Sequence, residues 1–365
     1  MADTTINQFA PDYAVHPGEI LEETLEARGM KKAAFAKRCG LSDKTVSQII
    51  NGKAPVTPET AIQFERVLGV SATVWNNLEA FYRLHTAQAT ARKKLGRQTT
   101  WAEKFPIKEL VRRGILEKPD NKVDAVEKLL NLFGVGSVNA WKRRFSELSV
   151  AYRHSPSFES APESVATWLR LGELYSEDID TKPYSRARFI AALKKIRSLT
   201  TEPPEVFEPK MKEMCAKAGI ALVFVSELPG THLSGTTRWL GKDKALIMLS
   251  LRHKSDDHLW FSFFHEAAHV LLHGKRNVFL DETDRMSGDK EDEANQFARN
   301  MLIPEGEYST FSARRRFYRN DIEAFARKVG IAPGIVVGRL QHEEKIPHAW
   351  HNVLKRKFTL VETKE

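Results

Sequence analysis

Residues 261–273 read FSFFHEAAHVLLH, where two histidines and a glutamate interrupt an apolar run. Residues four apart lie one above the other on an α-helix, so the imidazoles of His265 and His269 can bind one metal ion. In such sites the glutamate after the first histidine lies beside a metal-bound water and acts as a general base, which assigns that role to Glu266. Burying these polar groups without partners costs on the order of several kcal/mol, so a bound ion explains the pattern better than chance. The spacing predicts a zinc peptidase site on a buried helix.

A later segment, residues 291–304 with the sequence EDEANQFARNMLIP, offers a third ligand. Glu291 and Glu293 each share a helix face with apolar residues, so periodicity alone leaves both open. Both carboxylates also suit the first turn of a helix because of its dipole. His273 continues the four-residue ladder beyond His269 and is a weaker candidate for the third ligand, and we expect it beside the ligands or partly exposed.

Together the two motifs resemble the ImmA/IrrE family of zinc metallopeptidases over roughly residues 205–345. That family pairs H-E-x-x-H with a later E-x-E-A-N-x-F-A-x-x-L-L-x-P, from which this chain departs at Met301, with Ile303 before the proline. The resemblance implies an α+β, zincin-like domain with one Zn²⁺ per chain and a repressor-like protein as substrate. Its implied site residues are the ligands His265, His269 and Glu293 and the catalytic base Glu266.

Two short apolar runs before the motif, residues 220–225 and 245–250, predict strands of a small sheet. We expect an edge of this sheet to hold an extended substrate peptide by main-chain pairing.

Residues 32–52 read KAAFAKRCGLSDKTVSQIING and predict a helix-turn-helix, with Ser42 capping the second helix. Polar side chains there are free to reach bases and phosphates. The candidate DNA-binding residues are Ser42, Asp43, Lys44, Thr45, Ser47 and Gln48. A helix-turn-helix used only for packing is the alternative. Residues 324–331 repeat the layout of residues 34–41, but an apolar helix follows, and we interpret that copy as packing.

With its flanking segments, such as HPGEIL at residues 16–21, the region of about residues 14–88 resembles the HigA-like antitoxin branch of the XRE family. The resemblance implies a homodimer on a palindromic operator DNA, with a toxin as a further partner.

The composition fits a chain that acts on a polyanion. The 365 residues carry a formal net charge of +9, which favours nucleic acid as a partner. The two cysteines, Cys39 and Cys215, are too few for a disulfide framework or a thiolate zinc site. No signal peptide or spanning segment is visible, so we expect a cytoplasmic protein without a membrane partner.

We therefore predict a mainly α multidomain protein with one α+β domain. The expected parts are a helix-turn-helix domain at 1–90, a helical middle segment at 91–204, a peptidase domain at 205–345 and a C-terminal tail at 346–365. The predicted function is that of a DNA-binding zinc endopeptidase that regulates transcription by cleaving a repressor or antitoxin-like partner. The alternative is a HigA-like repressor or antitoxin whose peptidase-like domain is catalytically silent or senses a ligand.

Overall fold

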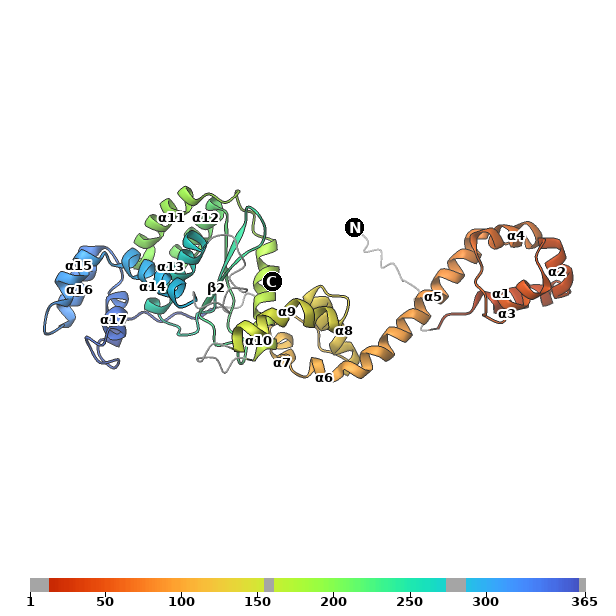
Figure 1. Cartoon of the computed structure of the whole chain (residues 1–365), viewed down its shortest axis with the longest axis horizontal. Helices are drawn as coiled ribbons and strands as arrows, with labels where there is room; N and C mark the ends of the chain where they lie inside the picture. The colour runs from red at the N-terminus through yellow and green to blue at the C-terminus, as the bar shows by residue number, and fades with distance from the viewer. Residues whose placement is uncertain (1–12, 154–160, 274–286, 361–365) are drawn as a thin grey trace, which may run out of the picture. The chain divides into compact units, whose positions relative to one another are not determined.

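A computed structural model describes residues 13–153, 161–273 and 287–360 of the chain. The chain divides into two compact units, unit 1 at residues 1–98 and unit 2 at residues 99–365. Figure 1 shows that unit 1 is built from helices and that unit 2 surrounds a small sheet with helices. Within the described ranges, no helix is both long and apolar enough to cross a membrane. The mainly α, multidomain prediction is confirmed.

Unit 1 is all-α, and polar caps set its helix starts. Its elements are α1 (Pro17–Ala27), α2 (Lys32–Cys39), α3 (Asp43–Ile50), α4 (Pro58–Leu68), α5 (Ala72–Leu95) and η1 (Gly96–Gln98). The side chains of Ser42, Thr57 and Ser71 accept hydrogen bonds from backbone N–H groups in the first turns of α3, α4 and α5. The fully buried core residues include Leu21, Phe35, Val46, Phe64 and Trp75.

Unit 2 begins with helices that lead to the sheet. They are α6 (Thr99–Ala102), α7 (Ile107–Arg112), α8 (Lys122–Phe133), α9 (Val138–Arg153), α10 (Pro162–Glu177), α11 (Arg186–Ser198), η2 (Leu199–Thr201) and α12 (Pro204–Ala218). The helices after the sheet are α13 (Asp256–Leu272), α14 (Ser287–Leu302), α15 (Glu305–Ser312), α16 (Arg319–Val329), α17 (Pro333–His342) and η4 (Asn352–Leu354).

The sheet has the strand order β1-β3-β2. Its strands are β1 (Ile220–Phe224), β2 (Gly235–Trp239) and β3 (Ala245–Leu249), with β1 parallel and β2 antiparallel to β3. The two apolar runs form β1 and β3 as predicted. Strand β2 was not predicted, because its sequence GTTRW lacks the apolar run that marked β1 and β3, although Thr and Trp favour strands.

Helices cover both faces of the sheet (Figure 1). Successive β3 side chains point to opposite faces of the sheet. On one face Ile247 belongs to the same buried hydrophobic cluster as residues of α13, and on the other face Met248 lies against Gly172 of α10. Helix α10 crosses the strand so closely that a Cβ at Gly172 would lie 1.9 Å from Met248 Sδ. The fold around the sheet therefore includes α10, which precedes residue 205.

The chain after α17 returns to the start of α13. The Phe358 N–H donates to Lys254 O at 3.0 Å, and the Asp256 N–H donates to Arg356 O at 3.0 Å. Lys355 Nζ lies 2.6 Å from Asp257 Oδ2. Residues up to Phe358 are thus bound to the helix that carries the histidines.

The turn between α16 and α17 has the same backbone geometry as the turn between α2 and α3. In both turns the glycine, Gly40 or Gly330, has a φ of 70°. Its N–H donates to a carbonyl three residues back, and the next residue donates to one five residues back. Most of α17 is buried and the helix packs against α13, which agrees with a packing role for the second copy.

Candidate metal centre and nucleic-acid interface

The metal centre is built on α13, which is buried on most sides. Its apolar residues face the sheet, α14 and α17, and this packing fixes the rotation of the helix. His265 and His269 lie one turn apart, with their Nε2 atoms 3.0 Å from each other. Both side chains are largely buried, at 16% and 6% exposure. The helical spacing thus brings the two predicted ligands together.

Glu291, near the start of α14, reaches this pair. Its carboxylate oxygens lie 3.1 Å from His265 Nε2 and 3.4 Å from His269 Nε2. Glu293 lies elsewhere, with Oε2 3.3 Å from His273 Nε2. Two residues along a helix correspond to a rotation of about 200°, so the two carboxylates cannot both face the histidine pair. Within the described residues, the cluster with metal-ligand geometry consists of His265, His269 and Glu291.

The separations within the cluster suit the ligands of one metal ion. The Nε2 atoms of His265 and His269 lie 3.0 Å apart, and Glu291 places one carboxylate oxygen 3.1 Å from His265 Nε2 and the other 3.4 Å from His269 Nε2. Ligand atoms of a small tetrahedral metal site lie about 3.3 Å from one another. The Nδ1 atom of His265 lies 3.0 Å from the amide oxygen of Asn295. Because that oxygen only accepts, Nδ1 donates. A neutral His265 then offers the Nε2 lone pair to a metal.

The ionisation of the cluster follows from burial and mutual contact. Burial by itself lowers the pKa of His265, but the hydrogen bond to Glu291 and the charge of Glu266 outweigh it and raise that pKa above its ordinary value. Burial lowers the pKa of His269 to about 4. The hydrogen bond between His265 and Glu291 thus favours the charged form of each group, raising the pKa of the imidazole and lowering that of the carboxyl.

Glu266 lies beside the ligands, buried under β2. Burial raises the pKa of its carboxyl to about 7, although the nearby His265 acts in the opposite direction. The Thr237 hydroxyl donates to the Glu266 backbone oxygen at 3.0 Å. A Cβ at Gly235 would lie only 2.9 Å from Glu266 Cγ and Oε1. A carboxyl that titrates near neutral pH suits a general base.

Strand β2 is an edge of the described sheet, and Gly235 and Thr237 on its α13-facing side lie next to Glu266. The Ser250 N–H donates to Ser234 O, and the Leu240 N–H donates to Lys244 O, each at 3.0 Å. In an antiparallel ladder the bonded residues alternate. Gly235 and Thr237 therefore direct their N–H and C=O groups away from β3, where an extended peptide can pair with them.

Two residues of this site were missed in the sequence. Asn295 is four residues after Glu291 on α14, and that spacing was available as a signal within the EDEAN motif. Gly235 carried no signal, because its role depends on how closely β2 approaches Glu266.

The candidate DNA-binding residues divide into two groups on α3. Asp43, Lys44 and Ser47 are exposed, and Gln48 is half-buried. Ser42 and Thr45 belong to the helix cap, because Ser42 Oγ accepts from the Thr45 N–H at 3.1 Å and lies 2.8 Å from the Thr45 hydroxyl. The opposite face of α3, with Val46, is buried against α1 and α2.

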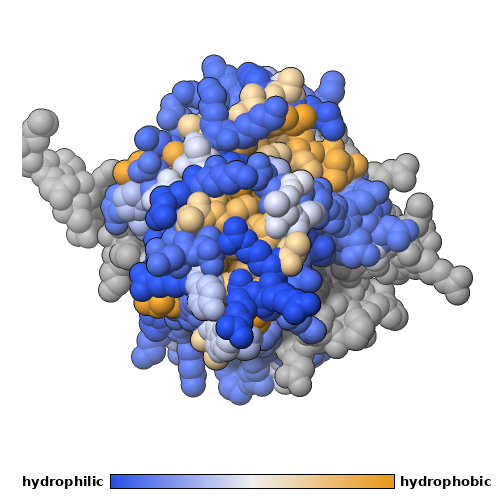
Figure 2. All heavy atoms as spheres, turned by 90° about the vertical axis from the view of Figure 1, so that its left-hand side faces the viewer, coloured by the Kyte–Doolittle hydropathy of each residue, from blue (hydrophilic) through white to orange (hydrophobic). Residues whose placement is uncertain are grey.

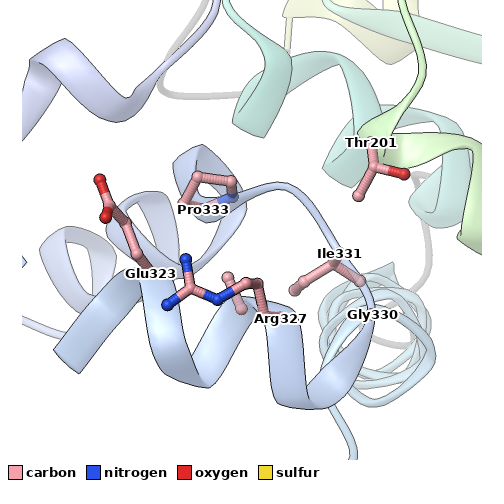
Figure 3. Close-up of a pocket in the computed structure, with 7 residues that line it drawn as sticks. Thr201, Glu323, Arg327, Gly330, Ile331 and Pro333 are labelled. Atoms are coloured by element: carbon pink, nitrogen blue, oxygen red, sulfur yellow. The ribbon is translucent and has the colours of Figure 1, made fainter. Parts of the chain in front are cut away.

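A separate hollow lies in unit 2 between η2, α16 and the start of α17. It has a volume of about 420 Å³ and is lined by Thr201, Glu323, Ala326, Arg327, Gly330, Ile331 and Pro333 (Figure 3). The side of unit 2 that carries α15 and α16 mixes hydrophobic and hydrophilic patches (Figure 2). Its lining residues differ from those of the candidate metal centre, so the two lie apart.

Comparisons with known proteins match the chain in two places. Residues 21–75 match a helix-turn-helix family, and residues 215–341 match the IrrE N-terminal-like domain. The chain is 35% identical over 74 residues to the uncharacterized HTH-type transcriptional regulator YddM of Escherichia coli, over 20% of this chain and 79% of that protein. It is 36% identical over 76 residues to virulence-associated protein I of Dichelobacter nodosus, over 20% of this chain and 70% of that protein.

Solved structures also align with part of this chain. One is PA4674 of Pseudomonas aeruginosa in complex with its operator DNA, at 35% identity, 21% of this chain, 85% of that chain and a TM-score of 0.21. Another is an addiction module antidote protein of a HigA family from Coxiella burnetii, at 31% identity, 23% of this chain, 91% of that chain and a TM-score of 0.21.

Proposed function

Because this chain belongs to the helix-turn-helix regulators and carries an IrrE N-terminal-like domain, we propose that it is a DNA-binding zinc endopeptidase that cleaves a repressor or antitoxin-like partner. The observation that carries the proposal is the cluster of His265, His269 and Glu291 beside the buried carboxyl of Glu266.

In this proposal His265, His269 and Glu291 hold the metal, and Glu266 is the base. Zinc bound there polarises the scissile carbonyl and lowers the pKa of a water to about 7. The Glu266 carboxylate accepts the proton of the attacking water and later donates it to the leaving amine. The burial that raises the Glu266 pKa to about 7 suits both transfers.

The substrate is an extended segment of a protein. Outward-directed backbone groups of Gly235 and Thr237 lie on the strand that contacts Glu266. Pairing with them places a peptide beside the base without selecting its side chains. This edge explains how an endopeptidase holds a loop or a linker, and it leaves the sequence preference to neighbouring side chains.

For DNA, we propose that Asp43, Lys44, Ser47 and Gln48 contact the operator, while Ser42 and Thr45 maintain the start of α3. The exposure of Asp43, Lys44 and Ser47 and the cap formed by Ser42 and Thr45 support this division, and Gln48 is half-buried. The homodimer and the toxin partner implied by the sequence resemblance stay predictions.

Two measurements on the full chain test the enzyme. Mass spectrometry should find about one zinc per chain, lost in His265→Ala and kept in Glu266→Gln. Mapping of new protein N-termini in a host lysate should then find cleavages made by the wild type and not by Glu266→Gln. Identical N-termini from both proteins, or no zinc after reconstitution, would support the alternative of a regulator with a silent domain.

A further inference from the structure

We propose that His273 and Glu293 form a hydrogen-bonded relay that positions His269 on the metal, while Glu291 is the third ligand. The inference rests on the proposed metal site and assigns roles to two residues that do not touch the ion. His273 and Glu293 are positioning residues, because they act through His269.

The relay runs from His269 on α13 through His273 to Glu293 on α14. His269 Nδ1 lies 2.8 Å from His273 Nδ1, and His273 Nε2 lies 3.3 Å from Glu293 Oε2. The His269 and His273 side chains are each 6% exposed, whereas that of Glu293 is 65% exposed. The buried histidine pair is thus linked to solvent through a carboxylate.

Only one arrangement of protons fits this chain with neutral imidazoles. An ionised carboxylate only accepts hydrogen bonds, so Nε2 of His273 carries the proton and donates it to Glu293. The Nδ1 atom of His273 is then a lone pair and accepts from Nδ1–H of His269. That leaves the Nε2 lone pair of His269 facing His265 and Glu291. Glu293 therefore selects the tautomer of His269 that can bind a metal.

The two histidine ligands are supported differently. The partner of His265 is the amide oxygen of Asn295, an acceptor by its own chemistry. The partner of His269 is another histidine, which becomes an acceptor at Nδ1 only when a group at Nε2 takes its proton. Glu293 supplies that group, and without it His273 can adopt the tautomer that donates to His269 and disfavours metal binding.

The test measures the zinc dissociation constant of the full chain by competition with a chromophoric chelator. Glu291→Ala should lose zinc almost entirely. Glu293→Ala should weaken binding about 10–100-fold, the usual effect of removing an outer hydrogen-bond partner, and Glu293→Gln should restore part of the loss because its amide oxygen still accepts. Asp292→Ala is the matched control, since it removes an exposed carboxylate one residue away, and its affinity should equal that of the wild type.

A double substitution separates a relay from independent effects. The side-chain oxygen of Asn can replace Nδ1 of His273 as acceptor, so His273→Asn should bind zinc better than His273→Ala. In the His273→Asn background, Glu293→Ala should have no further effect. Additive losses would overturn the relay, and so would a loss in Asp292→Ala equal to that in Glu293→Ala.

Cobalt spectra separate ligands from positioning residues. The visible absorption of bound Co²⁺ should change in Glu291→Ala and keep its band positions in Glu293→Ala at saturating metal. Zinc retained by Glu291→Ala and lost by Glu293→Ala would make Glu293 the ligand and overturn the inference. If the zinc affinities of the variants are as expected but the wild type cleaves no protein, the relay is supported and the peptidase proposal is refuted. A wild type that binds no metal would refute both.

Discussion

Gly235 of β2 faces Glu266 of α13 at a distance that leaves no room for a side chain: a Cβ there would lie 2.9 Å from Glu266 Cγ and Oε1. We therefore expect Gly235→Ala to displace the Glu266 carboxyl while the metal ligands stay in place. A misplacement of about 1 Å can cost about 100-fold in rate. Cleavage of the natural partner, once identified by N-terminus mapping, should fall by about that factor.

The matched control is Gly241→Ala, because the space around that glycine is open. Its cleavage rate should equal that of the wild type, and both variants should contain one zinc. A Gly235→Ala protein with full activity would show that β2 does not hold Glu266 in place. Loss of zinc in that variant would instead point to a wider distortion of α13.

Gly219 joins α12 to β1 with a φ of 93°, and a Cβ there would lie 2.3 Å from Tyr184 Cα. We expect Gly219→Ala to destabilise unit 2 through both backbone strain and this clash. Gly114→Ala is the control, because Gly114 also has a positive φ, 72°, but faces open space. The strain alone costs about 1–2 kcal/mol, so Gly219→Ala should lower the free energy of unfolding by more than Gly114→Ala. Equal effects in denaturant melts would mean that Tyr184 moves aside.

The pair of Asp257 and Lys355 predicts an acid-sensitive link between α13 and the C-terminal segment. Burial alone raises the pKa of Asp257, but the hydrogen bonds from Lys355 and Ser255 outweigh it and hold that pKa below its ordinary value. A carboxyl with a lowered folded-state pKa stabilises the protein above its unfolded pKa of about 3.9 and loses this contribution as the pH falls further.

Lys355→Met leaves Asp257 buried without its cation, which should cost about 3–5 kcal/mol near pH 7. Protonation of the carboxyl removes this penalty, so the difference in melting temperature between the variant and the wild type should narrow as the pH falls toward 3. Thermal melts from pH 3 to pH 7 measure it. A difference that stays constant would mean that Lys355 stabilises the protein by packing alone.

The sequence predicted those parts of the site that lie on one element. His265, Glu266 and His269 follow from the period of a single helix, and Ser42 follows from cap chemistry. The choice between Glu291 and Glu293 depends on the rotation of α14 against α13, and helix periodicity defines faces without saying which face meets another helix. Strand β2 and Gly235 were missed for a related reason, because the pairing of β2 with β3 and its closeness to Glu266 are long-range contacts that no local sequence pattern marks.

The division of α3 into contact and cap residues predicts three different kinds of defect. Ser42→Ala removes the acceptor of the Thr45 N–H and should cost about 1 kcal/mol of stability, with an unchanged operator sequence preference.

Lys44→Ala should weaken binding to all DNA sequences and reduce the salt dependence of log K by about 0.9 if the lysine contacts a phosphate. Ser47→Ala with Gln48→Ala should relax the preference for the operator, because these side chains can reach base edges. Selection from random DNA, followed by affinity measurements at several salt concentrations, separates the three cases. If Ser42→Ala changed the sequence preference, or Ser47→Ala with Gln48→Ala left it intact, the recognition surface would lie elsewhere than on the exposed face of α3.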